Sequence, residues 1–227
     1  MKRSSLLLVS AVALALLAGC GKHASGGGSS STGAGSAQRG PFDYYLLSLS
    51  WSPQYCGTIG GEHDDPQCAP DRHYGFVVHG LWPQNEHGQN PRACPSEEKL
   101  DNQTLQSMLD IMPSDMLIRH EWGSHGVCTG LNAKDFFAKT RTAFNQVKIP
   151  AKYKNPDKSM VVKVKEFRED LIKANDGLSE DKFAIYCDNR FLREVRVCVE
   201  QDLRFRSCGA NIRNACGLDE MVLRAVR

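Results

Sequence analysis

Residues 119–130, Arg-His-Glu-Trp-Gly-Ser-His-Gly-Val-Cys-Thr-Gly, are the stretch around which this chain is organised. They place His120, Glu121 and His125 within six positions. In a helix, successive side chains are separated by about 100° around the axis, so these three would lie within about 140° on one face. Glu121 and His125 would be neighbours at i and i+4, close enough for the carboxylate to orient or charge the imidazole. The stretch predicts a proton-transferring surface on a helix whose end is held by Cys128.

A second stretch, Phe76-Val-Val-His-Gly-Leu-Trp-Pro-Gln84, carries a third histidine. The apolar run before His79 predicts a strand, and the residues after it predict a turn. His79 would then lie at the rim of a sheet beside the indole of Trp82. Because imidazole is present in both protonation states near its ordinary pKa of about 6.5, two histidines can serve as general base and general acid without a cofactor.

The two stretches together resemble the paired motifs of the ribonuclease T-two family. The shared pattern is HGLWP at residues 79–83, then HEW at 120–122, HG at 125–126 and Cys128, and family-like features extend over about residues 41–216. The resemblance implies an α+β fold in which a mostly antiparallel sheet packs against several helices and is stabilised by disulfides. It also implies cleavage of single-stranded RNA through a 2′,3′-cyclic phosphate to 3′-phosphate ends, with no metal or other cofactor.

The resemblance implies a role for each matching residue. His79 and His125 would form the acid/base pair, and His120 would hold phosphate oxygens. Glu121 would polarise the phosphate or support His125. The chain departs from the family at Ser124, because the residue before the second catalytic histidine is usually a lysine. A serine hydroxyl donates one hydrogen bond but supplies no charge, so either a Lys or Arg elsewhere substitutes for it or the rate is lower.

Base recognition is expected to use stacking on Trp82, because every base of single-stranded RNA presents a π-face. The alternative role for Trp82 is that of a turn residue capping the core. Gln84, two residues further on, is an amide where some family members have an acid, so we expect a shifted base preference.

Three other functions are less compatible with the sequence. A zinc hydrolase of the HExxH type would need its second histidine at i+4, whereas here it follows His120 at i+5. A Cys/His protease centred on Cys128 would compete with the use of that cysteine in a disulfide. A catalytically weak or inactive family member that binds RNA or protein is supported only by Ser124.

The nine cysteines divide into Cys20 and eight others. An even number in an exported chain predicts four disulfides, although spacing alone leaves on the order of 100 pairings. The family resemblance implies the pairs Cys56–Cys68, Cys94–Cys128, Cys187–Cys216 and Cys198–Cys208. No metal site is predicted, because the sequence has no CxxC pair and no clustered set of Cys and His.

The first 40 residues predict export. Two basic residues precede an apolar run of about 13 residues, which is too short to span a bilayer and is typical of a signal peptide over residues 1–19. Leu17-Ala-Gly-Cys20 resembles a bacterial lipoprotein processing site. We therefore expect a lipid on Cys20 that anchors the protein to a membrane, in the periplasm or at the cell surface. Ordinary secretory cleavage with an unmodified cysteine is the alternative.

A tether and one catalytic domain follow. Residues 20–40 are rich in Gly and Ser and predict a flexible tether, and residues 41–227 are long enough for one domain with a sizeable core. The chain has 28 basic and 26 acidic residues, of which four basic and no acidic ones precede residue 41, so the domain has a formal charge of −2. Any nucleic-acid site must therefore be a local cationic patch completed by protonated histidines. We expect a monomer.

Periodicity predicts where the helices and strands lie in this domain. Helices in its first half and strands at both ends favour an α+β fold. The expected helices are 97–111, 132–147 and 166–174, and the expected strands are 42–51, 182–186, 191–200 and 203–206, with a hairpin turn at Asp188-Asn189.

Overall fold

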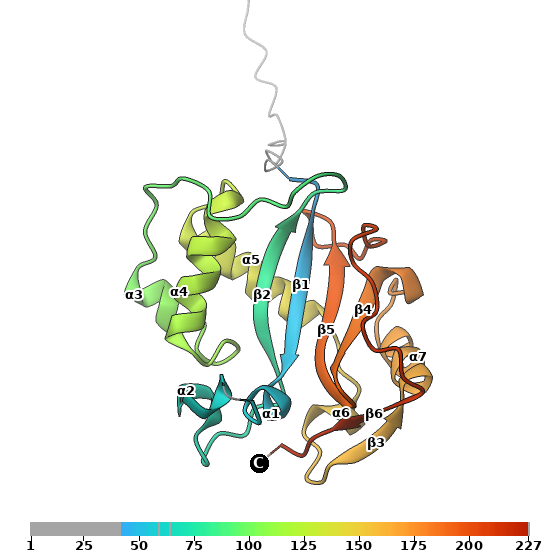
Figure 1. Ribbon diagram of the computed structural model, residues 1–227. Coiled ribbons are helices and arrows are strands. Elements are labelled where there is room, and N and C mark those ends of the chain that lie inside the picture. Colours follow the sequence, from blue (N-terminus) through green and yellow to red (C-terminus); the bar gives the residue numbers. More distant parts are fainter. Residues whose placement is uncertain (1–41, 59, 64, 227) are drawn as a thin grey trace, which may run out of the picture. The chain divides into compact units, whose positions relative to one another are not determined.

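The computed structural model describes residues 42–58, 60–63 and 65–226 (Figure 1). This part of the chain contains a six-stranded sheet in the order β2-β1-β5-β6-β3, with β4 also paired to β5. All pairings are antiparallel except that of β5 with β6, so the expected α+β fold with a mostly antiparallel sheet is confirmed. The strands are β1 (Tyr44–Trp51), β2 (Phe76–Gln84), β3 (Met160–Lys163), β4 (Phe183–Asp188), β5 (Phe191–Val199) and β6 (Glu220–Leu223).

Some of the helices begin at a residue whose side chain caps them. Ser114 accepts a hydrogen bond from the Leu117 N–H at the start of α4, and Asn132 accepts one from the Asp135 N–H at the start of α5. The helices are α1 (Ser52–Tyr55), α2 (Asp65–Cys68), α3 (Asn102–Gln106), α4 (Asp115–Ser124), α5 (Ala133–Gln146), α6 (Ala151–Lys154) and α7 (Val164–Ala174), with short 3-10 turns η1 (Gly61–His63), η2 (Gly126–Cys128) and η3 (Glu180–Lys182).

The two faces of the sheet have different compositions. Alternate residues of β1, including Leu47, Leu49 and Trp51, lie in the main core, where they are joined by Phe136 and Phe137 of α5. Helix α5 lies behind β1 and β2 in the view of Figure 1. The intervening β1 residues lie on the opposite face and include two buried or half-buried serines, Ser48 and Ser50. One face of the sheet is therefore apolar and packed, and the other can carry polar side chains.

A β-bulge in β2 decides which of its side chains reach the polar face. Ser48 pairs with Gly80 whereas Leu49 pairs with Val78, so the residue between them, His79, has no partner on β1. Val78 and Leu81 both belong to the main core although they are three residues apart, which strict alternation does not allow. The bulge thus places both His79 and Trp82 on the polar face.

Several local predictions are wrong. The turn expected after His79 is absent, because β2 continues through Gln84 while pairing with β1. The helix expected over 97–111 is limited to α3, after which the chain makes turns that bury Met108 and Met112. The strand expected over 203–206 is reduced to one bridge between Val199 and Phe205. Strands β3 and β6 were not predicted, since each is only four residues long and is defined by its pairing with the other.

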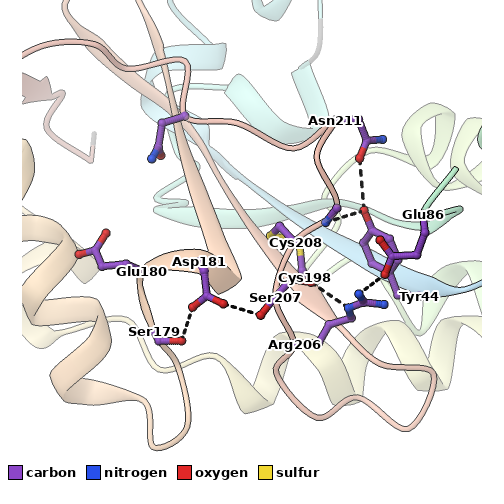
Figure 2. Close-up of a disulfide and its surroundings, with 12 residues drawn as sticks. Tyr44, Glu86, Ser179, Glu180, Asp181, Cys198, Arg206, Ser207, Cys208 and Asn211 are labelled. Carbon is purple, nitrogen blue, oxygen red and sulfur yellow. Dashed lines mark hydrogen bonds and ion pairs between the residues drawn. A yellow bond between two sulfur atoms is a disulfide. The ribbon is translucent and has the colours of Figure 1, made fainter.

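Four disulfides connect the described residues, in the pairing that the resemblance implied: Cys56–Cys68, Cys94–Cys128, Cys187–Cys216 and Cys198–Cys208. The surroundings of Cys198–Cys208 are shown in Figure 2. The expected signal peptide, the lipidated Cys20 and the tether lie outside the described residues. Among the residues that are described, no helix is long and apolar enough to cross a membrane.

Candidate functional site

His79 is held by a buried carboxylate that the sequence analysis did not identify. Its Nδ1 lies 2.7 Å from Oε1 of Glu194 on β5, and Glu194 is only 4% exposed. Burial by itself would raise the pKa of Glu194, but the hydrogen bond and charge of His79 and the charge of Arg196 outweigh it and lower the pKa to about 2. Because a carboxylate can only accept, Nδ1 of His79 carries the proton. The Nε2 atom of His79 is not used in this bond and can exchange a proton with a ligand.

Arg196 fixes Glu194 in turn. Its Nη2 and Nε atoms lie 2.7 and 2.9 Å from Oε2 of Glu194. The guanidinium carbon also lies 4.0 Å from the ring centroid of Tyr186 and 5.0 Å from that of Trp82. With one carboxylate oxygen bound to Arg196 and the other to His79, Glu194 has little freedom to move. The chain from Arg196 to His79 is therefore a preorganised support for the imidazole.

Glu121 is the second buried carboxylate. It lies on the inward face of α4 with Ile118 and Trp122 and is 1% exposed. Its Oε2 accepts a hydrogen bond from Nε1 of Trp82 at 2.7 Å, and its Oε1 lies 3.9 Å from Nε2 of His79. Burial raises the pKa of Glu121 to about 7, although the charge of His79 and the Trp82 hydrogen bond oppose this. Glu121 can therefore gain or lose a proton near neutral pH.

The close approach of α4 to β2 depends on a glycine. A Cβ atom at position 80 would overlap the Glu121 carboxylate and the Trp82 indole nitrogen. Gly80 therefore provides the space in which these two groups form their hydrogen bond.

His125 occupies a different environment from His79. Helix α4 ends at Ser124, and His125 is its C-cap with φ −128° and ψ −47°, although its N–H still donates to the Glu121 carbonyl at 3.0 Å. Burial, together with the positive charges of Arg92, His120 and His79, lowers the pKa of His125 to about 4. Nδ1 of His125 is buried, and none of the described residues forms a hydrogen bond with it. His125 is therefore a neutral imidazole above about pH 5.

The expected support of His125 by Glu121 is wrong in this structure. The Glu121 side chain contacts Trp82 and His79, which lie on the sheet, because the helix turns Glu121 toward β2 and ends before His125. The two histidines are instead related through Trp82, whose ring centroid lies 5.1 Å from that of His79 and 5.5 Å from that of His125. The indole thus contacts both expected acid/base residues and Glu121.

His120 and Ser124 lie at the more exposed side of α4. Ser124 Oγ is 3.5 Å from Nε2 of His120, the distance limit for a hydrogen bond. His120 and His79 both line a cleft of about 600 Å³ whose walls also include Glu194, Arg193 and the exposed Met116. The cleft is large enough for a nucleotide-sized ligand.

Gln84 does not face this cleft. It is buried, its Nε2 donates to the Pro83 carbonyl, and its Oε1 accepts from Nδ2 of Asn90 at 2.8 Å. These contacts show that the Gln84 amide holds the loop after β2. Across the described residues, no group of three or more His, Cys, Asp and Glu side chains is arranged to hold a metal ion.

Glu194, Arg196 and Arg92 are the residues of the site that sequence analysis missed. Glu194 and Arg196 lie within the apolar strand β5, and a carboxylate between Leu192 and Val195 is itself a signal, because such charges are rarely buried without a partner. The partner could not be named, because His79 is 115 residues away in the sequence. Arg92 lies in a loop without any periodic pattern.

Comparisons with known proteins agree on one family. The model of the Ribonuclease T2 family matches residues 42–208. A ribonuclease of Aeromonas hydrophila is 32% identical over 205 residues, which cover 84% of this chain and 89% of that relative. A probable ribonuclease of Haemophilus influenzae is 38% identical over 128 residues, 51% of this chain and 47% of the relative.

Solved structures agree on the fold. Trichomaglin, described as an S-like ribonuclease, superimposes with a TM-score of 0.66 at 18% identity and covers 82% of this chain and 99% of its own. RNase NT in complex with 5′-AMP gives a TM-score of 0.56 at 23% identity, over 74% of this chain and 91% of its own.

Proposed function

Because this chain belongs to the Ribonuclease T2 family and is a ribonuclease of that type, we propose that it cleaves single-stranded RNA by attack of the 2′-OH on the neighbouring phosphorus. The 2′-OH loses its proton, the phosphorus–O5′ bond breaks, and the departing oxygen takes up a proton. The resulting 2′,3′-cyclic phosphate is then hydrolysed to a 3′-phosphate with the two proton-transfer roles reversed.

The single observation that carries this proposal is the contrast between the two imidazoles that contact Trp82. His125, with its pKa lowered to about 4, is neutral and suited to accept the 2′-OH proton. His79 has its Nδ1 proton fixed by Glu194, so a proton on Nε2 gives an imidazolium that lies against two buried carboxyl groups. We assign the general base of the cleavage step to His125 and the general acid to His79.

The remaining expected site residues receive supporting roles. His120, on the wall of the cleft, would bind phosphate oxygens. Glu121, with a pKa near 7, would donate a hydrogen bond to a phosphate oxygen when protonated and would balance the His79 charge when ionised. Trp82 holds Glu121 and contacts both histidines, and its half-exposed ring would stack on a base. No metal or other cofactor takes part in the proposed reaction.

We also propose that the enzyme acts outside the cytoplasm as a monomer anchored to a membrane by a lipid on Cys20. The signal-like residues 1–19 and the Leu-Ala-Gly-Cys sequence at 17–20 support this proposal. The four disulfides suit an oxidising compartment such as the periplasm or the cell surface.

The proposed function is tested by incubating the purified protein with RNA in EDTA and identifying the product ends. Cyclic phosphates followed by 3′-phosphates are expected. His79→Ala and His125→Ala should each lower the rate by about 10²–10⁴-fold. Glu194→Gln should lower it by about 10²-fold, because an amide N–H facing Nδ1 favours the wrong tautomer of His79. Cleavage at the wild-type rate by both histidine variants would refute the assignment.

A further inference from the structure

The transition state of phosphoryl transfer carries negative charge that must be stabilised, and the residues already assigned leave this need unmet. Ser124 is neutral. Arg196 forms an ion pair with Glu194. The Nε atom of Arg119 on α4 lies 4.0 Å from Oδ2 of Asp115 on the same helix. Arg193 on β5 lines the cleft beside His79 and His120. A permanent positive charge on the His125 side of the site must therefore come from an element other than α4 or β5.

The loop between β2 and α3 is fixed to the end of α4 beside the catalytic histidine. The Ala93 N–H donates to the carbonyl of Ser124 at 2.8 Å. The next residue, Cys94, forms the disulfide with Cys128, and its N–H also lies 3.1 Å from the Cys128 sulfur. Ala93 has a φ of +49°, which is unfavourable for a residue with a Cβ and is maintained here by contacts on both sides. The backbone of Arg92 is thereby held next to Ser124, which directly precedes His125.

The charge of Arg92 acts on the interior of the site. After burial, Arg92 is the largest cause of the lowered pKa of His125, and it also opposes the raised pKa of Glu121. Arg92 itself is exposed, and none of the ion pairs among the described residues includes it. The charge of Arg92 thus acts on His125 and Glu121, and no acid among the described residues forms an ion pair with its guanidinium.

We propose that Arg92 is a catalytic residue that binds the scissile phosphate and stabilises the charge of the transition state from the loop side of the site. A guanidinium presents a planar fork of donors that matches two oxygens of one phosphate and stays charged at every working pH. This inference rests on the proposed ribonuclease function and deepens it, because it names a cation that compensates for the neutral Ser124. The bonds from Ala93 and Cys94 to the α4 end would hold that cation at a fixed position.

The test compares Arg92→Gln and Arg92→Lys with the matched control Arg119→Gln, which removes an exposed arginine from α4. With a dinucleoside monophosphate as substrate, Arg92→Gln should lower kcat/KM by about 10²-fold, with most of the loss in kcat. Arg92→Lys should lower it by about 10-fold, because a single ammonium replaces the fork. Arg119→Gln should stay within about 2-fold of wild type. Circular dichroism and a free-thiol assay establish that each variant is folded with its disulfides intact.

A rescue and a titration separate catalysis from structure. Ser124→Lys placed on the Arg92→Gln background should recover about 10-fold of the lost rate, because it returns a cation to the same phosphate. An NMR titration of the His125 ring should give a higher pKa in Arg92→Gln than in wild type. Equal kcat/KM for Arg92→Gln and Arg119→Gln would overturn the Arg92 proposal while leaving the ribonuclease assignment intact. The failure of the ribonuclease assignment is a different result, namely wild-type cleavage by His79→Ala and His125→Ala.

Discussion

The burial of the Glu121 carboxylate makes the stability of the fold depend on pH. Its folded pKa of about 7 lies above the ordinary value of 4.5, so the folded state binds its proton more tightly than the unfolded state does. The stability associated with this proton is fully present below about pH 4.5 and is lost as the pH rises through about 7. One pKa unit corresponds to about 1.4 kcal/mol, so the loss amounts to about 3 kcal/mol.

Glu121→Gln should therefore become more stable relative to wild type as the pH rises. Glutamine is uncharged and can still accept the Trp82 hydrogen bond. The unfolding free energy of Glu121→Gln minus that of wild type should therefore increase by about 3 kcal/mol between pH 4.5 and pH 8. Urea denaturation at both pH values measures this difference. The exposed Glu169→Gln on α7 is the control and should show no such change. If the unfolding free energies of Glu121→Gln and wild type differ by the same amount at both pH values, burial does not raise the pKa of Glu121.

At the scale of single residues, the sequence located the candidate site residues but not their partners. His79, His120, Glu121 and His125 were identified through the two motifs. The partner of Glu121 was predicted from helical spacing and was wrong, since α4 ends at Ser124. The partner of His79 depends on β5 pairing with β1, which no local pattern contains.

Among the secondary-structure elements, the bulged strand β2 and helix α4 meet at Gly80. Gly80→Ala should displace the Trp82 indole or the Glu121 carboxylate, because its Cβ would overlap both. We expect a rate reduction of about 10²-fold, the usual effect of misplacing a site by about 1 Å. The matched control is Gly123→Ala in α4, whose Cβ would meet nothing within 4 Å and which should keep its activity and gain up to about 1 kcal/mol of stability. Similar rates for the two variants would show that the contact at Gly80 does not position the site.

The Cys94–Cys128 disulfide joins the loop after β2 to the end of α4. Cys94→Ala/Cys128→Ala should lower the rate per folded molecule by about 10²-fold as well as the stability by about 2–5 kcal/mol, because it releases both Arg92 and the residues after His125. The experiment measures activity and urea denaturation at a temperature where the variants remain folded.

The control for that experiment is Cys187→Ala/Cys216→Ala, which should lose stability but little activity. The Cys198–Cys208 disulfide is less suitable, because it packs with Tyr44 and Trp82 in a small cluster on the polar face. Figure 2 shows this disulfide beside Tyr44, whose hydroxyl accepts from the Gly209 N–H and whose ring lies 4.4 Å from the Arg206 guanidinium. Equal activity losses in the two double variants would assign the Cys94–Cys128 bond to stability alone.

Elements with strong patterns were predicted well and those defined by distant pairing were not. The helical spacing of Phe136, Phe137 and Thr140, all of which are buried, predicted α5 within one residue at each end. The bulge at His79 escaped prediction because Gly and Pro after an apolar run also indicate a turn, and only the pairing with β1 shows that the strand continues.

At the scale of the whole molecule, the N-terminal 40 residues predict that the protein is anchored to a membrane through Cys20. Cys20→Ser should release the protein from membrane fractions or leave it unprocessed, because the lipid would have no attachment site. Cell fractionation with immunoblotting measures this, and Ser29→Ala in the predicted tether serves as the control. A Cys20→Ser protein that matures normally and sediments with membranes would exclude this cysteine as the anchor.

The position of β1 between β2 and β5 has a consequence for the timing of activity. All three motif histidines are synthesised before α5, but the carboxylate that fixes the tautomer of His79 follows 115 residues after it. A nascent chain that ends before β5 leaves one edge of β1 unpaired and His79 without Glu194. Most of the domain must therefore be synthesised before His79 gains the carboxylate that fixes its tautomer.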